Sequence, residues 1–117
     1  MKTSMHYLLA LGLVFATPAV ATDAFSGAED LRGWCSSMDQ DDVHWGLCVG
    51  SVAAVHDTVM TYQSFEEMRQ VICTGPDTSR GDLVITVMEY MENNPGTLEY
   101  SLGDVVFSAL REAYPCP

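Results

Sequence analysis

His56 and Asp57 are the residues whose types and spacing come closest to catalytic machinery, and Ser51 lies five residues before His56. In acyl-transfer enzymes a histidine takes the proton of a hydroxyl nucleophile while a carboxylate orients its ring. Helical side chains five residues apart do not face each other. Ser51 also lacks the preceding strand and the second glycine of a nucleophile elbow. We therefore expect no catalytic site, and we interpret His56 and Asp57 as polar residues that point two ways from a helix.

His44 stands close to two carboxylates, Asp41 and Asp42. A histidine with two acids could hold a divalent metal. Acidic residues are also common at helix N-termini, where they interact favourably with the helix dipole. We favour this second interpretation and expect neither a metal site nor a cofactor.

Four cysteines, Cys35, Cys48, Cys73 and Cys116, contain no Cys-x-x-Cys pair among them. Their spacing disfavours a zinc site or a thioredoxin-like redox site. An even number of cysteines in a small exported domain indicates structural disulfides. Four cysteines allow three pairings, and the helical layout predicted below favours Cys35 with Cys48 and Cys73 with Cys116.

The composition predicts one small domain with an acidic surface. A chain of 117 residues leaves no room for two domains of ordinary size. It has 16 Asp and Glu against five Lys and Arg, so its formal net charge is −11. Such a surface repels phosphate backbones, which excludes nucleic acid as the expected partner. A charged partner should be basic, unless the acidity only keeps the protein soluble.

Residues 1–21 have the features of a cleavable signal peptide. Lys2 provides the positive start, residues 8–16 form an apolar run, and Ala19-Val20-Ala21 provides the small-x-small pattern of a cleavage site. The apolar run is about nine residues long, whereas a membrane-spanning helix needs about twenty. We predict cleavage after Ala21 and a mature domain, 22–117, that is soluble in the periplasm. Removing Lys2 leaves four arginines against the sixteen acids.

The spacing of apolar residues predicts an all-α fold, a small bundle of four to five helices stapled by two disulfides. The first helix should cover Ala28 to Ser37, with Ser26 as its N-cap and Glu29 completing a capping box. The central helix should cover Val43 to Tyr62. Its small residues Gly46, Gly50 and Ala54 lie four apart, which would allow another helix to approach closely.

Three further Ser-x-x-acid patterns predict the starts of the remaining helices. Ser64 with Glu67 predicts a short helix before Cys73, Ser79 with Asp82 a helix that stops at 93–96, and Ser101 with Asp104 a final helix. A turn is expected at 74–77. The short connection between the last two helices should make them antiparallel neighbours.

Two apolar residues fall off the buried stripes of their predicted helices, Ile85 and Phe107. Exposed apolar residues that gather in a patch mark an interface. Partial packing under a neighbouring segment is the alternative explanation.

The ordered motifs of the chain resemble the Rap/Tai family of type VI secretion immunity proteins. The resemblance rests on Leu31-Arg-Gly-Trp-Cys35, on Trp45-Gly-Leu-Cys-Val-Gly50 before a long helix, on Cys73 in a turn, on 83–95, and on the closing Ala109-Leu-Arg-Glu-Ala-Tyr-Pro-Cys116. It covers nearly all of the mature chain. The family usually has proline close after the third cysteine, whereas Thr74-Gly75 intervenes here, and the segment 63–72 is longer than expected. These departures bear on the identity of the partner.

This resemblance implies a periplasmic, non-enzymatic protein that binds and blocks a peptidoglycan amidase delivered by neighbouring bacteria. The amidases of this system look like papain-type cysteine peptidases, and family members can act as homodimers. We expect inhibition by occlusion of the amidase cleft. The family motifs do not identify the residues that contact the partner. Our hypothesis places these contacts on the loop at 93–100 and on one side of the last helix: Asn94, Glu99, Tyr100, Asp104, Phe107 and Arg111.

The sequence is also compatible with two other functions. An orphan member of the family would bind a different envelope protein with the same fold. An acid-stress chaperone of the HdeA kind would have to loosen in acid through repulsion between like charges. Once the carboxylates are protonated, only four arginines, two mature histidines and the amino terminus carry charge, which makes that repulsion modest.

Overall fold

The computed structural model describes residues 26–37 and 42–117, and these residues form four α-helices and one short 3-10 helix. The elements in chain order are α1 (Ala28–Cys35), α2 (Asp42–Ser64), α3 (Arg80–Asn93), η1 (Pro95–Glu99) and α4 (Leu102–Ala113). The only β-type pairing within these residues is an isolated bridge between Gly27 and Ser101. The all-α prediction is confirmed. The predicted signal peptide and its cleavage site lie outside the described residues.

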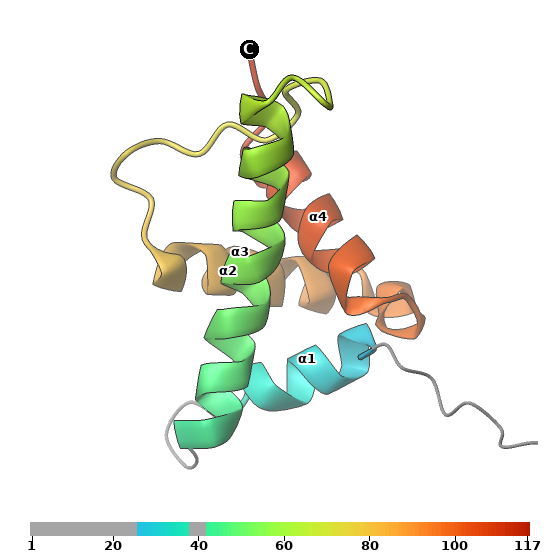
Figure 1. The fold of residues 1–117 in the computed structure, drawn as a ribbon. Helices are drawn as coiled ribbons and strands as arrows, with labels where there is room; N and C mark the ends of the chain where they lie inside the picture. The colour runs from blue at the N-terminus through green and yellow to red at the C-terminus, as the bar shows by residue number, and fades with distance from the viewer. Residues whose placement is uncertain (1–25, 38–41) are drawn as a thin grey trace, which may run out of the picture.

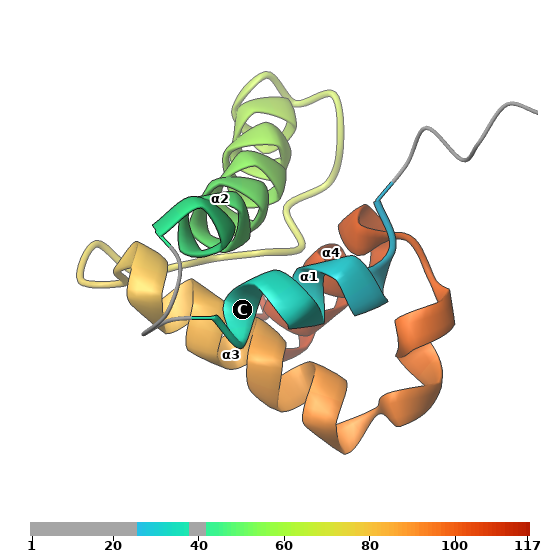
Figure 2. The same cartoon turned by 90° about the horizontal axis from the view of Figure 1, so that it is seen from below.

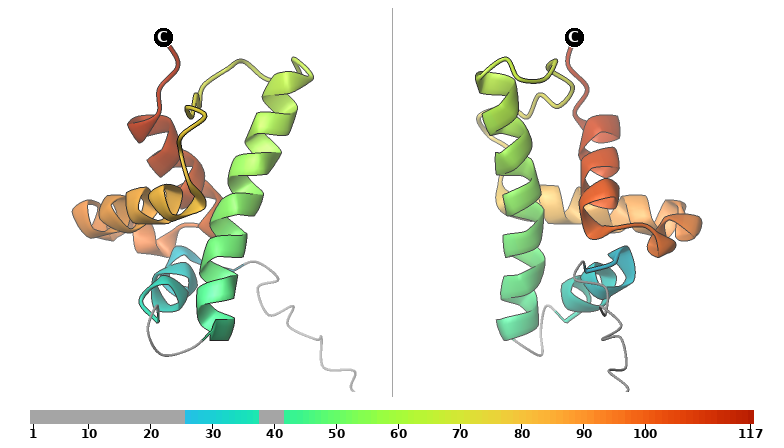
Figure 3. Two further views of the ribbon diagram at one scale, coloured as in Figure 1. Left: turned by 90° about the vertical axis from the view of Figure 1, so that its left-hand side faces the viewer. Right: turned by 45° about the vertical axis from the view of Figure 1, so that its right-hand side comes forward.

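The longest helix, α2, stands upright in Figure 1, with α3 passing behind it and α4 beside it. Helix α1 lies across the lower end of α2, as Figure 2 shows from below. Both views in Figure 3 show α3 crossing α2 and α4 steeply. The expected antiparallel pairing of α3 and α4 is therefore wrong. The connection between them contains η1 and is long enough to redirect the chain into a crossing.

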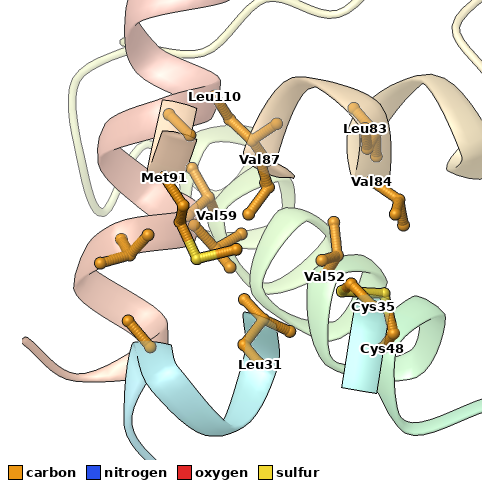
Figure 4. Packing of buried hydrophobic residues seen from close by; sticks show 14 of the residues in the cluster. Leu31, Cys35, Cys48, Val52, Val59, Leu83, Val84, Val87, Met91 and Leu110 are labelled. Atoms are coloured by element: carbon orange, nitrogen blue, oxygen red, sulfur yellow. A yellow bond between two sulfur atoms is a disulfide. The ribbon is translucent and has the colours of Figure 1, made fainter. Parts of the chain in front are cut away.

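All four α-helices turn apolar residues toward one core, and Figure 4 shows its labelled members meeting between the ribbons. A fully buried Val, Leu or Ile contributes about 1.5–3 kcal/mol relative to an exposed one, so this core is the main source of stability. The members least exposed to solvent are Ala28, Leu31, Cys48, Ile72, Val87, Val106 and Leu110.

Two disulfides staple the bundle, and both predicted pairings are confirmed. Cys35 at the end of α1 is bonded to Cys48 in α2, and Cys73 is bonded to Cys116 beyond α4. The first bond lies in the core, where both cysteines are at most 1% exposed. The second joins the segment before α3 to the end of the described chain. The Cys73 amide strengthens this junction by donating to the Tyr114 carbonyl at 2.8 Å.

A capping box begins α3 and a serine N-cap begins α4, at the predicted serines. The Ser79 hydroxyl accepts from the Asp82 amide at 3.1 Å, and the Asp82 carboxylate accepts from the Ser79 amide at 2.8 Å. These hydrogen bonds lower the pKa of the exposed Asp82 carboxyl, because they favour its ionised form. Ser101 likewise accepts from the Asp104 amide. The N-cap predicted for α1 is wrong by one residue, because Gly27 caps the helix and donates its amide to Asp30.

The helix predicted between Ser64 and Cys73 does not form. Instead α2 continues to Ser64, whose hydroxyl donates to the Thr61 carbonyl at 2.8 Å inside the helix. The chain reverses at Glu66, which has a φ of 57°. It then runs without helix to Cys73. A Ser-x-x-acid pattern stabilises a helix by capping the free amides at its start. Here Ser64 is the last residue of α2, so the chain leaves a helix at this pattern and does not begin one.

Gln63 explains how the segment after Glu66 is held. Its side chain is 6% exposed, and its Nε2 donates to the Ile72 carbonyl at 2.9 Å. Its Oε1 accepts from the amides of Val71 and Ile72 at 2.9 and 3.1 Å. The segment thus gains a strand-like set of hydrogen bonds from one side chain, and Ile72 enters the core.

Candidate functional site

His56 joins Asp57 and Thr74 in one hydrogen-bonded chain. His56 Nδ1 lies 3.1 Å from Asp57 Oδ1, and His56 Nε2 lies 3.0 Å from Thr74 Oγ1. The expectation that His56 and Asp57 point two ways is therefore wrong, because the ring bends back to its neighbour. Ser51 is not part of this chain of contacts. None of the three residues lines any groove described below, so the arrangement attaches the turn after Cys73 to α2.

Metal ligation has no geometric support in residues 26–37 and 42–117. No group of three or more His, Cys, Asp or Glu side chains in these ranges is placed to hold an ion. The sequence hypothesis of a site at His44 included Asp41, which lies outside these ranges, together with Asp42 at the start of α2.

Asp104, Phe107 and Arg111 lie on one side of α4, as their spacing of three and four residues requires. Phe107 is half-buried and packs against the core, which supports the alternative of partial packing. The Arg111 guanidinium carbon lies 5.5 Å from the centre of the Phe107 ring, a cation–π geometry. The Asp104 carboxylate accepts from the Ser101 hydroxyl at 2.8 Å. Arg111 and Asp104 are both exposed, but the Asp104 side chain is held by the N-cap serine of α4, whereas Arg111 is positioned by the Phe107 ring.

The other three predicted contact residues lie around η1, and they differ in their exposure and in the hydrogen bonds that hold them. The Asn94 side chain donates to the Tyr90 carbonyl at 2.8 Å, so it terminates α3. Tyr100 is 59% exposed, although its carbonyl accepts from the Ala28 amide. Glu99 is exposed as well. The six predicted residues therefore extend from the end of α3 along α4, with Asp104 in the first turn of α4 and Arg111 in its last turn.

Arg69 meets Arg111 at a groove of about 520 Å³, which we call the arginine groove. Val71, Cys116 and Pro117 also line it, and no acidic residue does. Neither arginine forms an ion pair with another described residue, although the chain has an excess of acids. No local pattern predicts this pairing, because the two arginines are far apart along the chain. The groove is a cationic spot on an acidic protein.

The small residues of α2 face solvent. A Cβ added at Gly46 or Gly50 would meet no atom within 4 Å, and Ala54 is exposed. The prediction that another helix of the chain packs there is wrong. Val43 and Leu47 lie on the same outer side and are 69% and 43% exposed. We call Val43, Leu47, Gly50 and Ala54 the α2 outer face. It is a largely exposed apolar strip, and Ala54 at one end of it borders a groove that Leu102 and Gly103 of α4 also line.

No helix in the described ranges is both long enough and apolar enough to cross a membrane.

Comparison with known proteins identifies the family of the chain. A family model for Rap1a immunity proteins matches residues 27–116, which include all four described α-helices and all four cysteines. No curated protein and no solved structure matches the chain. Because the match covers most of the sequence, the chain belongs to the Rap1a family of immunity proteins.

Proposed function

We propose that this protein is a periplasmic immunity protein that binds a peptidoglycan amidase effector of type VI secretion and occludes its catalytic cleft. Membership in the Rap1a immunity family is the observation that carries this proposal. The amidase as target follows from the resemblance of the sequence motifs to the Rap/Tai proteins. The predicted signal peptide would deliver the chain to the compartment where such an amidase cuts the cell wall.

Occlusion requires a fixed shape and no chemistry from the inhibitor. The two disulfides support this role because they join α1 to α2 and the segment before α3 to the end of α4. A surface that is rigid before binding loses less conformational entropy on association. A standard interface buries about 1,200–2,000 Å² in total, which a domain of this size can supply from one side.

The acidic surface supports a basic target. Opposite charges accelerate encounter and orient the partners, and this effect weakens as salt shortens the Debye length to about 10 Å at 0.1 M. We therefore expect the association rate to fall when salt is raised, with a smaller effect on dissociation.

The outer side of α4 is our proposed contact surface, and the structure decides which of its residues to test. Changing Asp104 would remove the carboxylate that accepts from the N-cap hydroxyl of Ser101, and changing Phe107 would disturb the core, so either change could alter folding as well as binding. Arg111 and Arg69 are exposed and free of ion pairs with described residues. At an interface they would receive acidic side chains of the amidase.

The decisive experiment is inhibition of a candidate amidase by the purified, oxidised protein. Candidates are the secreted amidases encoded near this gene, assayed on isolated peptidoglycan with binding measured by calorimetry. We expect Arg69→Glu with Arg111→Glu to weaken binding about tenfold or more, as loss of an arginine hot spot does. The control is Arg32→Glu with Arg80→Glu, which changes the net charge equally on α1 and α3.

Three outcomes would contradict parts of this proposal. If no amidase binds but an envelope protein of another kind co-purifies, the chain is an orphan binder. If Arg69→Glu with Arg111→Glu binds the amidase as tightly as the control variant does, the two arginines of the α4 side make no contact with the partner. If mass spectrometry of periplasmic extract finds residues 1–21 still attached, the predicted cleavage after Ala21 is wrong.

A homodimer through the α2 outer face is the second part of the proposal. Residues 43–56 contain no Asp, Glu, Lys or Arg, so two acidic copies can approach there with least repulsion. In a two-fold antiparallel pair, Val43 of one copy meets Ala54 of the other and Leu47 meets Gly50. Each large residue then faces a small one, as a self-complementary interface requires. Analytical ultracentrifugation should show a dimer that Leu47→Arg converts to monomer, and a monomeric wild-type protein would refute this part.

A further inference from the structure

An apolar groove runs along α3 on a side that the proposed α4 contacts do not use. Trp45 of α2 lines it opposite Gly81, Val84, Ile85 and Met88 of α3. Val84 is 2% exposed and forms a buried floor, whereas Ile85 is 55% exposed and forms an open wall. We call this feature the α3 groove. Ile85 lies off the buried stripe of α3, and the structure places it in an apolar patch that α2 and α3 share.

The size of the α3 groove argues for a side chain as its occupant. Its volume is about 280 Å³, at or below the lower end of the roughly 300–1,000 Å³ that small-molecule sites span. Interface hot spots, in contrast, are small pockets that accept one apolar or aromatic anchor surrounded by a polar rim. The groove has this form, with an apolar interior between two helices.

The rim of the α3 groove selects the charge of the partner. Glu89 and Glu92 are exposed and line the groove, and no basic residue does. The adjoining groove, which shares Met88 and Glu92, includes Arg32, but its guanidinium lies 3.3 Å from the Glu29 carboxylate. The local field is therefore negative. A second copy of this acidic chain fits poorly there, while a basic segment fits well.

We propose that the α3 groove receives an apolar side chain of the effector that is flanked by lysine or arginine. This inference rests on the proposed function for the identity of the partner, but not for the chemistry of the site. The apolar side chain would cover Val84 between Trp45 and Ile85. The flanking cation would reach Glu89 or Glu92 at the rim.

Gly81 allows the groove to be filled without removing any existing contact. A Cβ at Gly81 would meet only the Ser79 hydroxyl, at 3.6 Å, which is an ordinary contact. Because glycine is a poor helix former, Gly81→Leu should retain or raise the melting temperature. The same variant should occupy the groove with its own side chain. Gly33→Leu is the matched control, since Gly33 is an exposed glycine of α1 with no atom near its added Cβ.

Calorimetry with the cognate amidase tests the inference in the full oxidised protein. Gly81→Leu should weaken binding about tenfold or more, as blocking a hot-spot pocket does, while Gly33→Leu leaves it unchanged. Glu89→Gln with Glu92→Gln should weaken binding about threefold or more in low salt and less in high salt. If the amidase binds wild type and Gly81→Leu equally well, the inference is overturned and the proposed function stands.

A peptide probe tests the α3 groove even when no amidase binds. The probe is acetyl-Lys-Phe-Arg-amide at millimolar concentration, and the control peptide is acetyl-Glu-Phe-Glu-amide. NMR shifts should appear at the Trp45 indole and at the Ile85 and Met88 methyl groups with the basic peptide only, and Gly81→Leu should abolish them. Absence of shifts at these groups, or equal shifts with the acidic peptide, would refute the α3 groove as a site for a basic apolar segment.

Discussion

Replacing Gln63 with alanine should destabilise the protein more than any other change of a polar side chain in the described residues. Gln63 makes three hydrogen bonds to the backbone of Val71 and Ile72. Each such bond contributes about 1 kcal/mol net, which gives about 3 kcal/mol in total. The loss would also leave the amide and carbonyl of the fully buried Ile72 without partners, which adds to the cost.

Urea denaturation of the oxidised protein measures this effect, since both states then keep their disulfides. In a domain of this size 1 kcal/mol corresponds to about 4–8 °C in melting temperature, so Gln63→Ala should lower it by about 12–24 °C. Hydrogen exchange should report faster exchange at the amides of Val71 and Ile72. Gln70→Ala is the matched control, because Gln70 is exposed in the same segment. A loss below about 1 kcal/mol for Gln63→Ala would refute the role given to its side chain.

Three further perturbations test other parts of the structure. Replacing Cys73 and Cys116 by serine should cost about 4 kcal/mol by loop entropy, measured by urea denaturation, because the bond closes a long loop. The pKa of Asp82 lies below its ordinary 3.8, so its contribution to stability is present above that pH and is lost as pH falls through the folded-state value. Asp82→Asn should therefore flatten the acid limb of the curve of melting temperature against pH. His56→Ala should accelerate hydrogen exchange in the turn that follows Cys73, while inhibition of the amidase stays unchanged.

The elements that the sequence predicted well are those set by local signals. Ser79 and Ser101 each lie three residues before an acid and cap the helices that follow them, and apolar stripes at helical spacing mark α2, α3 and α4. The Ser64 box failed for a physical reason, because α2 continued through it and one side chain, Gln63, satisfied the following backbone. The crossing of α3 and α4 depends on η1, whose direction no local pattern specifies.

The candidate sites were harder to predict because they depend on tertiary contacts. Arg69 and Arg111 meet only after the disulfide at Cys116 brings the end of the chain to the segment after α2. Trp45 and Ile85 come from different helices. The α2 outer face was misassigned because small residues at helical spacing allow a close helix contact but do not require one. The bond at Cys48 holds α1 against the other side of α2, so Gly46 and Gly50 face solvent.

Charge and apolar contact act at different distances in the proposed complex. The acidic surface attracts a basic partner across roughly a Debye length, about 8–10 Å in moderate salt, and therefore governs how often the partners meet. The α3 groove contributes only after its interior has lost water, so it governs how long they stay together. Salt should then change the association rate of wild type and Gly81→Leu alike, whereas Gly81→Leu should raise the dissociation rate at every salt concentration. The acidity of the chain and its apolar surface thus have separate physical roles in the proposed complex.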